Sequence, residues 1–254
     1  MQKTIKTALV TGAGKRIGRQ IAIDLARDGW AVGVHYSSSD ADAKEVVAKI
    51  IDAGGRAVTV KGDLADRDSP AEVVAKTCEL LGPLTLLVNN ASLFERDEIG
   101  DMVVESWDRH LDINLRGPVL LAQAFANQMP DGQQGNIVNL IDQRVWRLTP
   151  DFFSYTISKA GLWTATQTLA QALAPEIRVN AIGPGPALPS SRMTISEFEK
   201  QCKLMPLEVG TSPAEISSAL AFILSAPAMT GQMIALDGGQ HLGWKTPDFT
   251  DVSE

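Results

Sequence analysis

The sequence has little cysteine, no run of basic residues and no long apolar segment, and each absence excludes a class of protein. The 2 cysteines, Cys78 and Cys202, lie far apart and outside any metal-ligand spacing, so neither a disulfide framework nor a metal site is expected. With a net charge of -7, the chain lacks the clustered Lys and Arg that nucleic acid or a membrane surface requires. No apolar stretch suits a signal peptide or a membrane span. We therefore expect a cytoplasmic protein that acts on a small molecule, with no nucleic-acid, membrane or metal partner.

The hydrophobic residues, 44% of the 254, form short apolar runs that alternate with helical patterns along the whole chain. Strands are predicted at residues 7–10, 31–35, 57–60, 84–88, 136–141, 178–182 and 233–236. No linker or repeat divides them. The pattern predicts an α/β fold: a single-domain, Rossmann-like, doubly wound and mainly parallel seven-stranded sheet with helices on both faces. Within this one domain, 1–254, residues 1–110 should mainly bind a dinucleotide, residues 111–243 should carry the catalytic and substrate groups, and residues 244–254 should form a C-terminal tail.

Turn chemistry marks several helix boundaries. Ser69 to Glu72 and Ser212 to Glu215 each have the capping-box pattern with proline at the second position, which predicts a helix starting after the serine. Residues 183–189 contain three prolines and two glycines, so this segment is predicted to be an irregular loop.

A glycine-rich turn, Thr11 to Gly18, separates the first predicted strand from the first helix. In such a turn the backbone N–H groups and the positive end of the helix dipole meet a pyrophosphate, and glycine permits the close approach. A glycine-rich turn is weak evidence alone, but its position between strand and helix strengthens it. The residues expected to face the dinucleotide here are Gly12, Lys15, Arg16, Ile17 and Gly18.

The end of the second strand indicates which dinucleotide is used. His35, Tyr36 and Ser37 should lie beside the adenosine ribose, where an NAD site usually places an acid to accept from the 2′-hydroxyl. From His35 onward, no acid occurs until Asp40. Lys15 and Arg16 could instead pair with a 2′-phosphate, and as merely solvated charges they would oppose the helix dipole. We therefore predict NADPH/NADP+ as the cofactor.

Other motifs also fall at the carboxyl ends of predicted strands, where ligands bind in doubly wound sheets. The further cofactor-binding residues expected at these ends are Asp63, Leu64, Asn90, Ala91, Ser92, Pro184 and Gly185.

Tyr155 and Lys159 are four residues apart in a predicted helix, so both side chains should point into the same space. A neighbouring cation favours the phenolate, and we expect Lys159 to lower the pKa of Tyr155 into a range useful for proton transfer. The spacing also occurs by chance on amphipathic helices. Asp142, at the end of the fifth strand, should lie nearby with a raised pKa, because a carboxyl in a partly dry cleft favours its neutral form.

Taken in order, Thr11 to Gly18, Asp63, Asn89 to Ala91, Asn114, Tyr155 with Lys159, and Pro184-Gly185 resemble the short-chain dehydrogenase/reductase family over essentially the whole length. The family usually has glycine at the position of Arg16 and a catalytic serine at that of Asp142. Both departures, with Phe94 after the Asn-Asn-Ala-Ser run, resemble the pteridine reductase branch, which includes bacterial dihydromonapterin reductases. Members of this branch have an arginine near the end of the second strand, and this chain does not.

The resemblance implies a role for each matching residue and a homotetrameric assembly. Asp142, Tyr155, Lys159 and Asn114 would be catalytic, with Lys159 also holding the nicotinamide ribose and Asn114 anchoring a water relay. Phe94 would stack a pterin against the nicotinamide; the alternative is an ordinary hydrophobic residue that seals a loop. The residues implied to contact substrate are Arg16, Phe94, Asp142, Tyr155, Pro186 and Leu188.

Three functions are consistent with these residues. The first is an NADPH-dependent reductase of a pterin of the dihydromonapterin, dihydrobiopterin or dihydrofolate type, with hydride transfer to a C=N bond and Tyr155 and Asp142 in the proton path. The second is a carbonyl reductase of the same fold. Asp142 favours the first, because an ionised carboxylate would repel the alkoxide formed from a ketone. The third is an NADP-binding regulator without turnover, which would need the glycine turn but not Tyr155 or Lys159.

Overall fold

The computed structural model describes residues 6–189 and 193–244. Its strands are β1 (Thr7–Val10), β2 (Ala31–Tyr36), β3 (Arg56–Lys61), β4 (Leu86–Asn89), β5 (Gly135–Leu140), β6 (Ile177–Pro184) and β7 (Met233–Leu236). They form one sheet in the order β3-β2-β1-β4-β5-β6-β7, and every pairing is parallel. The order reverses between β1 and β4, which is the switch point where such sheets bind ligands. The predicted fold class is confirmed, with a sheet that is wholly rather than mainly parallel.

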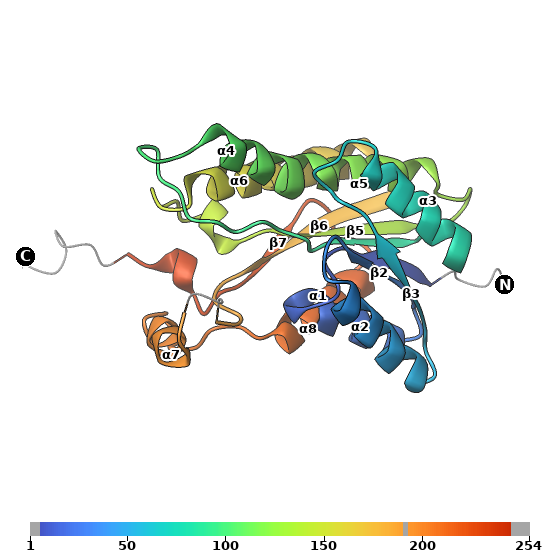
Figure 1. Cartoon of the computed structure of the whole chain (residues 1–254), viewed down its shortest axis with the longest axis horizontal. Coiled ribbons are helices and arrows are strands. Elements are labelled where there is room, and N and C mark those ends of the chain that lie inside the picture. Colours follow the sequence, from blue (N-terminus) through green and yellow to red (C-terminus); the bar gives the residue numbers. More distant parts are fainter. Residues whose placement is uncertain (1–5, 190–192, 245–254) are drawn as a thin grey trace, which may run out of the picture.

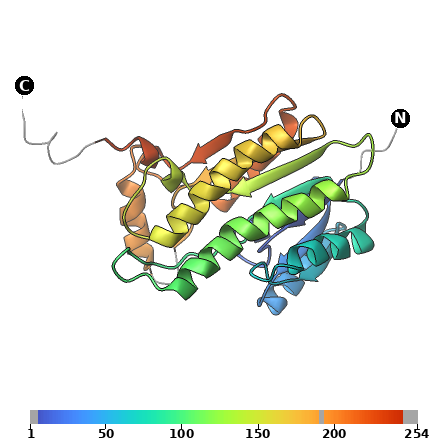
Figure 2. The ribbon, with the colours of Figure 1, turned by 90° about the horizontal axis from the view of Figure 1, so that it is seen from above.

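Helices cover both faces of the sheet (Figure 1). One layer consists of α1 (Arg16–Arg27), α2 (Asp40–Asp52) and α8 (Pro213–Ser225). The other consists of α3 (Ser69–Leu81), α4 (Val104–Leu111), α5 (Gly117–Asn127) and α6 (Phe153–Ala172), and Figure 2 looks down on this second layer. The short helices η2 (Gln143–Val145) and η3 (Gln240–Leu242) follow β5 and β7.

A helix that the sequence interpretation did not include, α7 (Ile195–Lys203), lies at the carboxyl-end side of the sheet (Figure 1). Thr194 caps it: its hydroxyl accepts from the backbone N–H of Glu197, whose carboxylate accepts from the backbone N–H of Thr194. This reciprocal capping box is readable in the sequence as Thr-x-x-Glu. At α3 the expected box is wrong, since the helix begins at Ser69 itself and its cap is Asp68, without a side-chain hydrogen bond.

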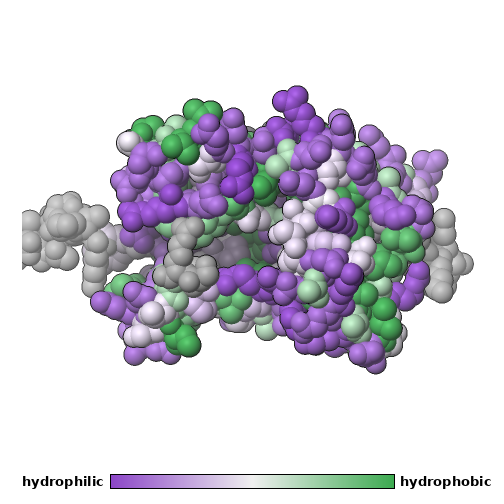
Figure 3. All heavy atoms as spheres, viewed as in Figure 1, coloured by the Kyte–Doolittle hydropathy of each residue, from purple (hydrophilic) through white to green (hydrophobic). Residues whose placement is uncertain are grey.

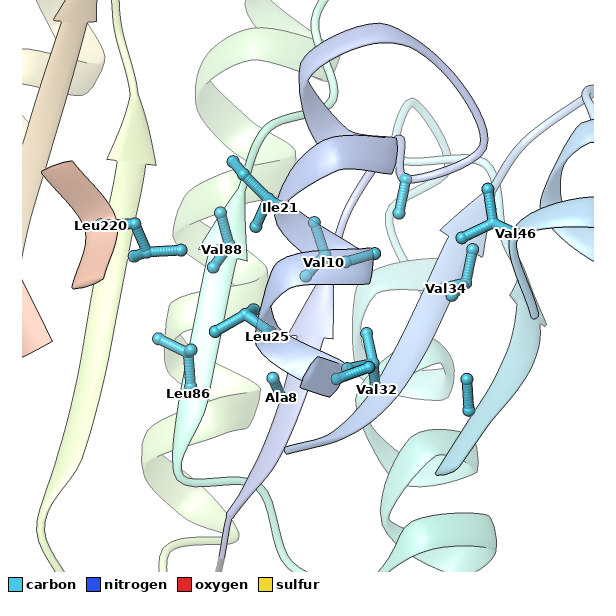
Figure 4. Close-up of a cluster of buried hydrophobic side chains, with 14 of the residues drawn as sticks. Ala8, Val10, Ile21, Leu25, Val32, Val34, Val46, Leu86, Val88 and Leu220 are labelled. Atoms are coloured by element: carbon cyan, nitrogen blue, oxygen red, sulfur yellow. The ribbon is translucent and has the colours of Figure 1, made fainter. Parts of the chain in front are cut away.

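The core explains why the strands are almost continuously apolar. Alternate residues of β1 point to opposite faces, so Val10 packs under α1 while Leu9 packs under the other helical layer. Figure 4 shows Ile21 and Leu25 of α1 against Val10 and Val88 of the strands. Each such fully buried aliphatic side chain contributes roughly 1.5–3 kcal/mol relative to exposure. A sheet buried on both faces therefore leaves only its strand ends for polar chemistry.

A π-helical segment, η1 (Asp112–Arg116), joins α4 to α5 in one continuous helical run. It contains Asn114, which is fully buried. Single π-helical turns within α-helices are frequent at functional sites.

Among residues 6–189 and 193–244, no helix combines the length and apolar character needed to cross a bilayer. The same residues contain no group of histidine, cysteine and acidic side chains placed to hold a metal ion.

Candidate active site

Tyr155 and Asp142 meet where β5 ends and α6 begins. The Tyr155 hydroxyl donates to Oδ2 of Asp142 over 2.9 Å, while Oδ1 of Asp142 accepts from the backbone N–H of Arg144 and caps η2. Burial raises the pKa of Asp142, although the Arg144 N–H, the Arg144 charge and the Tyr155 hydroxyl oppose the rise. The expected raised pKa of Asp142 is confirmed in direction, and the pair can exchange a proton directly.

The expected effect of Lys159 on Tyr155 is wrong for this structure. The Lys159 ammonium donates to the backbone carbonyl of Leu140 over 2.8 Å and lies 5.8 Å from the Tyr155 ring centroid. The pKa of Tyr155 is raised well above its usual value, first by burial and then by the charge of Asp142 and the hydrogen bond to it. Burial also lowers the pKa of Lys159 to about 8. The phenol is therefore a proton donor rather than a ready phenolate.

Asn114 braces the loop that carries Phe94. Its Oδ1 accepts from the Leu93 backbone N–H over 2.8 Å and from the Ser92 hydroxyl over 3.1 Å. Its Nδ2 donates to the Leu93 carbonyl and to the Ser158 hydroxyl. The side-chain amide is thus fully used in tying the β4–α4 loop to α6, and the water relay implied by resemblance stays a prediction.

Phe94 stands at the edge of the site as part of an aromatic group. Its ring lies edge-on to Tyr155, with centroids 4.7 Å apart, and stacks on Phe152 at 4.4 Å with the planes only 3° apart. The Arg144 guanidinium covers the far face of this pair, 4.9 Å from the Phe152 centroid. Phe94 remains 43% exposed, so part of its ring is accessible to a ligand.

Three residues outside the predicted set support this arrangement. Phe152 has left-handed backbone angles, φ 59° and ψ 48°, at the start of α6. The buried carboxylate of Asp97 accepts from the Ser154 backbone N–H and hydroxyl and so pins the loop to the first turn of α6. His110, fully buried, accepts from the Glu95 backbone N–H. These roles depend on distant partners, and the sequence carries no local signal for them.

The glycine turn is held in shape by two side chains. Thr11 Oγ1 accepts from the backbone N–H groups of Asn90 and Ala91, and Asn90 Nδ2 donates to the carbonyls of Thr11 and Gly12. His35 is buried; its Nδ1 accepts from the Gly12 N–H over 3.2 Å, and its Nε2 lies 3.2 Å from the Gly62 carbonyl. His35 therefore supports the turn from beneath rather than facing a ribose, and Thr11 is a residue that the predicted site omitted.

The first turn of α1 fits a diphosphate. Gly12 has φ +61°, and a Cβ there would press on Ala91 at 3.0 Å. No side chain caps α1 and no acid occupies its first turn, so Ile17 and Gly18 present backbone N–H groups at the positive helix end. In the catalytic half, Lys159 has three N–H donors and one hydrogen bond among the described residues, which leaves donors for a ribose hydroxyl.

Lys15 and Arg16 point to different sides of the turn. Lys15 forms an ion pair with Asp42 over 3.0 Å, beside the β2–α2 loop. Arg16, with a left-handed φ of 52°, donates to the carbonyls of Leu188 and Pro189 over 3.2 and 2.9 Å. The two cations thus lie apart, with Lys15 beside the β2–α2 loop and the Arg16 guanidinium against residues 188–189, and their pairing with a 2′-phosphate stays a prediction.

The remaining predicted residues gather at the same carboxyl edge. Tyr36 donates to Asp40 over 2.6 Å, and Ser37 is exposed beside it. Asp63 is exposed after β3, whereas Leu64 is buried and could reach a cofactor only through its backbone. Pro184 is the last residue of β6, and Gly185, Pro186 and Leu188 follow it. Figure 3 shows a hollow on this face between the upper helical layer and α7.

A doubly wound parallel sheet with a glycine turn at its switch point, and with Asn114, Tyr155 and Lys159 around one cleft, defines a nicotinamide-dependent oxidoreductase. The chain belongs to the short-chain dehydrogenase/reductase family. Residues 12–241 match the family described as Enoyl-(Acyl carrier protein) reductase. By sequence it is 33% identical over 241 residues to 3-oxoacyl-[acyl-carrier-protein] reductase of Synechocystis sp., covering 93% of this chain and 97% of that protein.

Two solved structures resemble the chain more strongly. One is FolM Alternative dihydrofolate reductase 1 from Brucella suis in complex with NADP, with a TM-score of 0.93 and 46% identity, covering 97% of this chain and 98% of that one. The other is the Brucella canis protein of the same name complexed with NADP, with a TM-score of 0.93 and 47% identity, covering 96% and 97%.

Proposed function

We propose that the protein is an NADPH-dependent reductase of a reduced pterin, transferring hydride to the carbon of a C=N bond while Tyr155 and Asp142 deliver the proton to its nitrogen. The observation that carries this proposal is the direct hydrogen bond between the Tyr155 hydroxyl and the Asp142 carboxylate. The similarity to the FolM structures, both crystallised with NADP, supports the cofactor and the substrate class.

The residues divide the work between binding and proton transfer. The nicotinamide supplies the hydride when it is bound. The uncapped start of α1 would hold the diphosphate, Lys15 would pair with the 2′-phosphate, and Lys159 would hold the nicotinamide ribose. Phe94, which is partly exposed, would offer its aromatic ring to the pterin for stacking. Tyr155 gives its proton to the substrate nitrogen and is reprotonated through Asp142.

A carbonyl reductase is the second candidate, and the sequence relatives favour it, since several are 3-oxoacyl-[acyl-carrier-protein] reductases. The site argues against it. The Tyr155 hydroxyl is already hydrogen-bonded to the carboxylate of Asp142, and the negative form of that group would oppose charge developing on a ketone oxygen.

NADPH oxidation with dihydromonapterin, dihydrobiopterin, dihydrofolate and a 3-oxoacyl thioester decides between the two. We expect the pterins to be substrates, and Asp142→Ser to abolish their reduction without changing the fold or NADPH affinity. Asp131→Ser, at an exposed loop position, is the matched control. A protein that reduces the thioester and ignores every pterin would be a carbonyl reductase. The homotetramer and cytoplasmic location belong to this proposal, and light scattering measures the assembly.

A further inference from the structure

A groove of about 570 Å³ lies between the segment after η2, the C-terminal end of α7 and η3. Its main lining residues are Arg147, Gln201, Leu204, Met205, Gln240 and Trp244. They supply one cation, two carboxamides and a broad apolar wall. Among the described residues that line it, none is acidic, although the chain as a whole carries a net charge of -7.

The Arg147 side chain is held in place by a hydrogen bond. Its Nη1 donates to the Gln240 carbonyl over 3.0 Å, and a Cβ at Gly243 would come within 2.8 Å of the same nitrogen. Within residues 6–189 and 193–244, no carboxylate forms an ion pair with it. The guanidinium therefore keeps donors for an anion from outside the chain. Lys200 and Lys203 in the last turn of α7 add positive charge nearby.

The groove and the candidate active site adjoin at Gln240 and at the segment that follows Asp142. Gln240 borders both: its carbonyl holds Arg147, and its side-chain Oε1 lies 3.2 Å from where a Cβ on Gly185 would stand. On the other wall, η2 starts directly after Asp142 and packs against η3 through Trp146 and His241, whose ring centroids are 5.2 Å apart. A ligand seated at Asp142 and Gly185 thus has this groove as an adjacent extension.

We propose that the groove binds an anionic aromatic extension of the substrate, which makes the substrate a pterin carrying a benzoylglutamate-type tail, as in dihydrofolate, rather than one with a short neutral side chain. This inference rests on the proposed pterin reduction. The tail's ring would lie on Leu204 and Trp244, and its carboxylates would pair with Arg147, since apolar wall and free cation match those two parts of the tail.

Steady-state kinetics of wild type, Arg147→Gln and Arg56→Gln test the assignment with dihydrofolate and dihydrobiopterin. Arg56 is an exposed arginine at the start of β3, at the opposite end of the sheet, and serves as the control. Removing a charge-assisted contact should raise the KM for dihydrofolate about tenfold or more. The kcat for dihydrofolate, and both constants for dihydrobiopterin, should stay unchanged in Arg147→Gln.

Equal effects on both substrates, no effect on either, or an altered assembly mass in place of altered selectivity would overturn the groove assignment and leave pterin reduction standing. A wild type inert towards every pterin would instead remove the proposed function. In that case, calorimetric titration of p-aminobenzoylglutamate into the NADP-loaded protein still examines the groove. If the wild type binds p-aminobenzoylglutamate and Arg147→Gln does not, the groove assignment is supported. If the wild type does not bind it, the assignment is refuted.

Discussion

The hydroxyl of Tyr155 donates a hydrogen bond to Oδ2 of Asp142 over 2.9 Å, at the junction of β5 and α6. Each group affects the other: the carboxylate's charge helps to raise the pKa of the phenol, and the phenol's donation partly offsets the rise that burial causes in the pKa of Asp142. Proton transfer here belongs to a coupled pair rather than to one residue.

Removing the phenolic proton should therefore stop chemistry without disturbing binding. We expect Tyr155→Phe to bind NADPH normally, because the ring and its contact with Phe94 are kept. Turnover should fall by about 10²–10⁴, the range for lost general-acid catalysis. Single-turnover NADPH oxidation and fluorescence titration measure the two effects. Near-normal rates with every substrate would show that Tyr155 is not the donor.

The pair also predicts how activity depends on pH. Because burial raises the pKa of Asp142, the carboxyl keeps its proton to higher pH than an exposed aspartate and loses it as the pH rises through that raised value. The kcat/KM for the pterin should fall over this range. Asp142→Asn cannot titrate, so its lower activity should no longer show this fall. A wild-type profile that rises with pH would contradict the proton-path role.

Cofactor selectivity should depend on Lys15 rather than on Arg16. Lys15 lies beside the β2–α2 loop, paired with Asp42, and loss of its charge should weaken NADPH about tenfold with little change for NADH. Arg16→Ala should instead raise the KM for the pterin, since its guanidinium holds the loop at Leu188 and Pro189. Binding of both dinucleotides to both variants measures this. If Arg16→Ala lost more NADPH affinity than the Lys15 variant, the expectation from the sequence that Arg16 pairs with the 2′-phosphate would hold.

His35 should make the protein acid-sensitive. Burial lowers its pKa to about 4, against about 6.5 in the unfolded chain. The unfolded state therefore gains a proton as the pH falls below 6.5, while the folded state resists until about 4. Roughly 3 kcal/mol of unfolding free energy should be lost across this window. The charge of Asp63 opposes the lowering of the pKa.

The matched variant is His35→Asn, which does not titrate. Its deficit in unfolding free energy relative to wild type should be largest at neutral pH and shrink as the pH falls from 6.5 to 4, as followed by urea denaturation. A deficit that stays constant with pH would show that His35 does not cause the acid sensitivity.

The backbone conformation of Phe152 should lower the stability of the fold, while its ring supports the substrate-facing Phe94. Its left-handed backbone costs roughly 1–2 kcal/mol in a residue other than glycine, while its stack with Phe94 contributes about 0.5–1.5 kcal/mol. Phe152→Gly loses both, so its stability should change by less than about 1 kcal/mol. Phe152→Ala keeps the strain and should be the less stable of the two.

Both Phe152 variants should raise the KM for the pterin severalfold, because Phe94 loses its backing ring. Thermal unfolding and steady-state kinetics separate the two effects. An unchanged KM in Phe152→Gly would mean that Phe94 holds its position without the stack.

The strand ends were the predictable part of this site, and the side-chain partners were not. A parallel sheet brings every strand's carboxyl end to one edge, so the alternating pattern alone placed the glycine turn, Asn90, Asp142 and Tyr155 together. Which partner a side chain chooses depends on geometry between distant segments. The four-residue spacing of Tyr155 and Lys159 therefore led to the wrong pKa direction, because burial and then the charge of Asp142 raise the pKa of Tyr155, while Lys159 bonds the Leu140 carbonyl.

Two capping-box patterns in the sequence were interpreted differently from what the structure shows. Thr194 and Glu197 form a capping box that marks α7, and this pattern was present in the sequence. Ser69 and Glu72 show the same spacing, yet α3 begins one position earlier because Asp68 takes the cap position. The left-handed conformation of Arg16 and the direction of its guanidinium have no sequence signature, since the contacts lie 172 and 173 residues away.

The π-helical segment at Asp112–Arg116 puts one extra residue into an otherwise regular helical run. Each residue of an α-helix turns the chain by about 100°, so this segment sets the rotational phase between α4 and α5. Deleting one residue here would restore regular α-helical geometry. It would also rotate α4 relative to α5 about the helix axis by about 100°. The helix could then keep Asn114 on the loop before Phe94 or keep the α5 core contacts of Leu121 and Phe125, but not both. The π-helical turn thus lets one helical run make both the loop contact of Asn114 and the core contacts of α5.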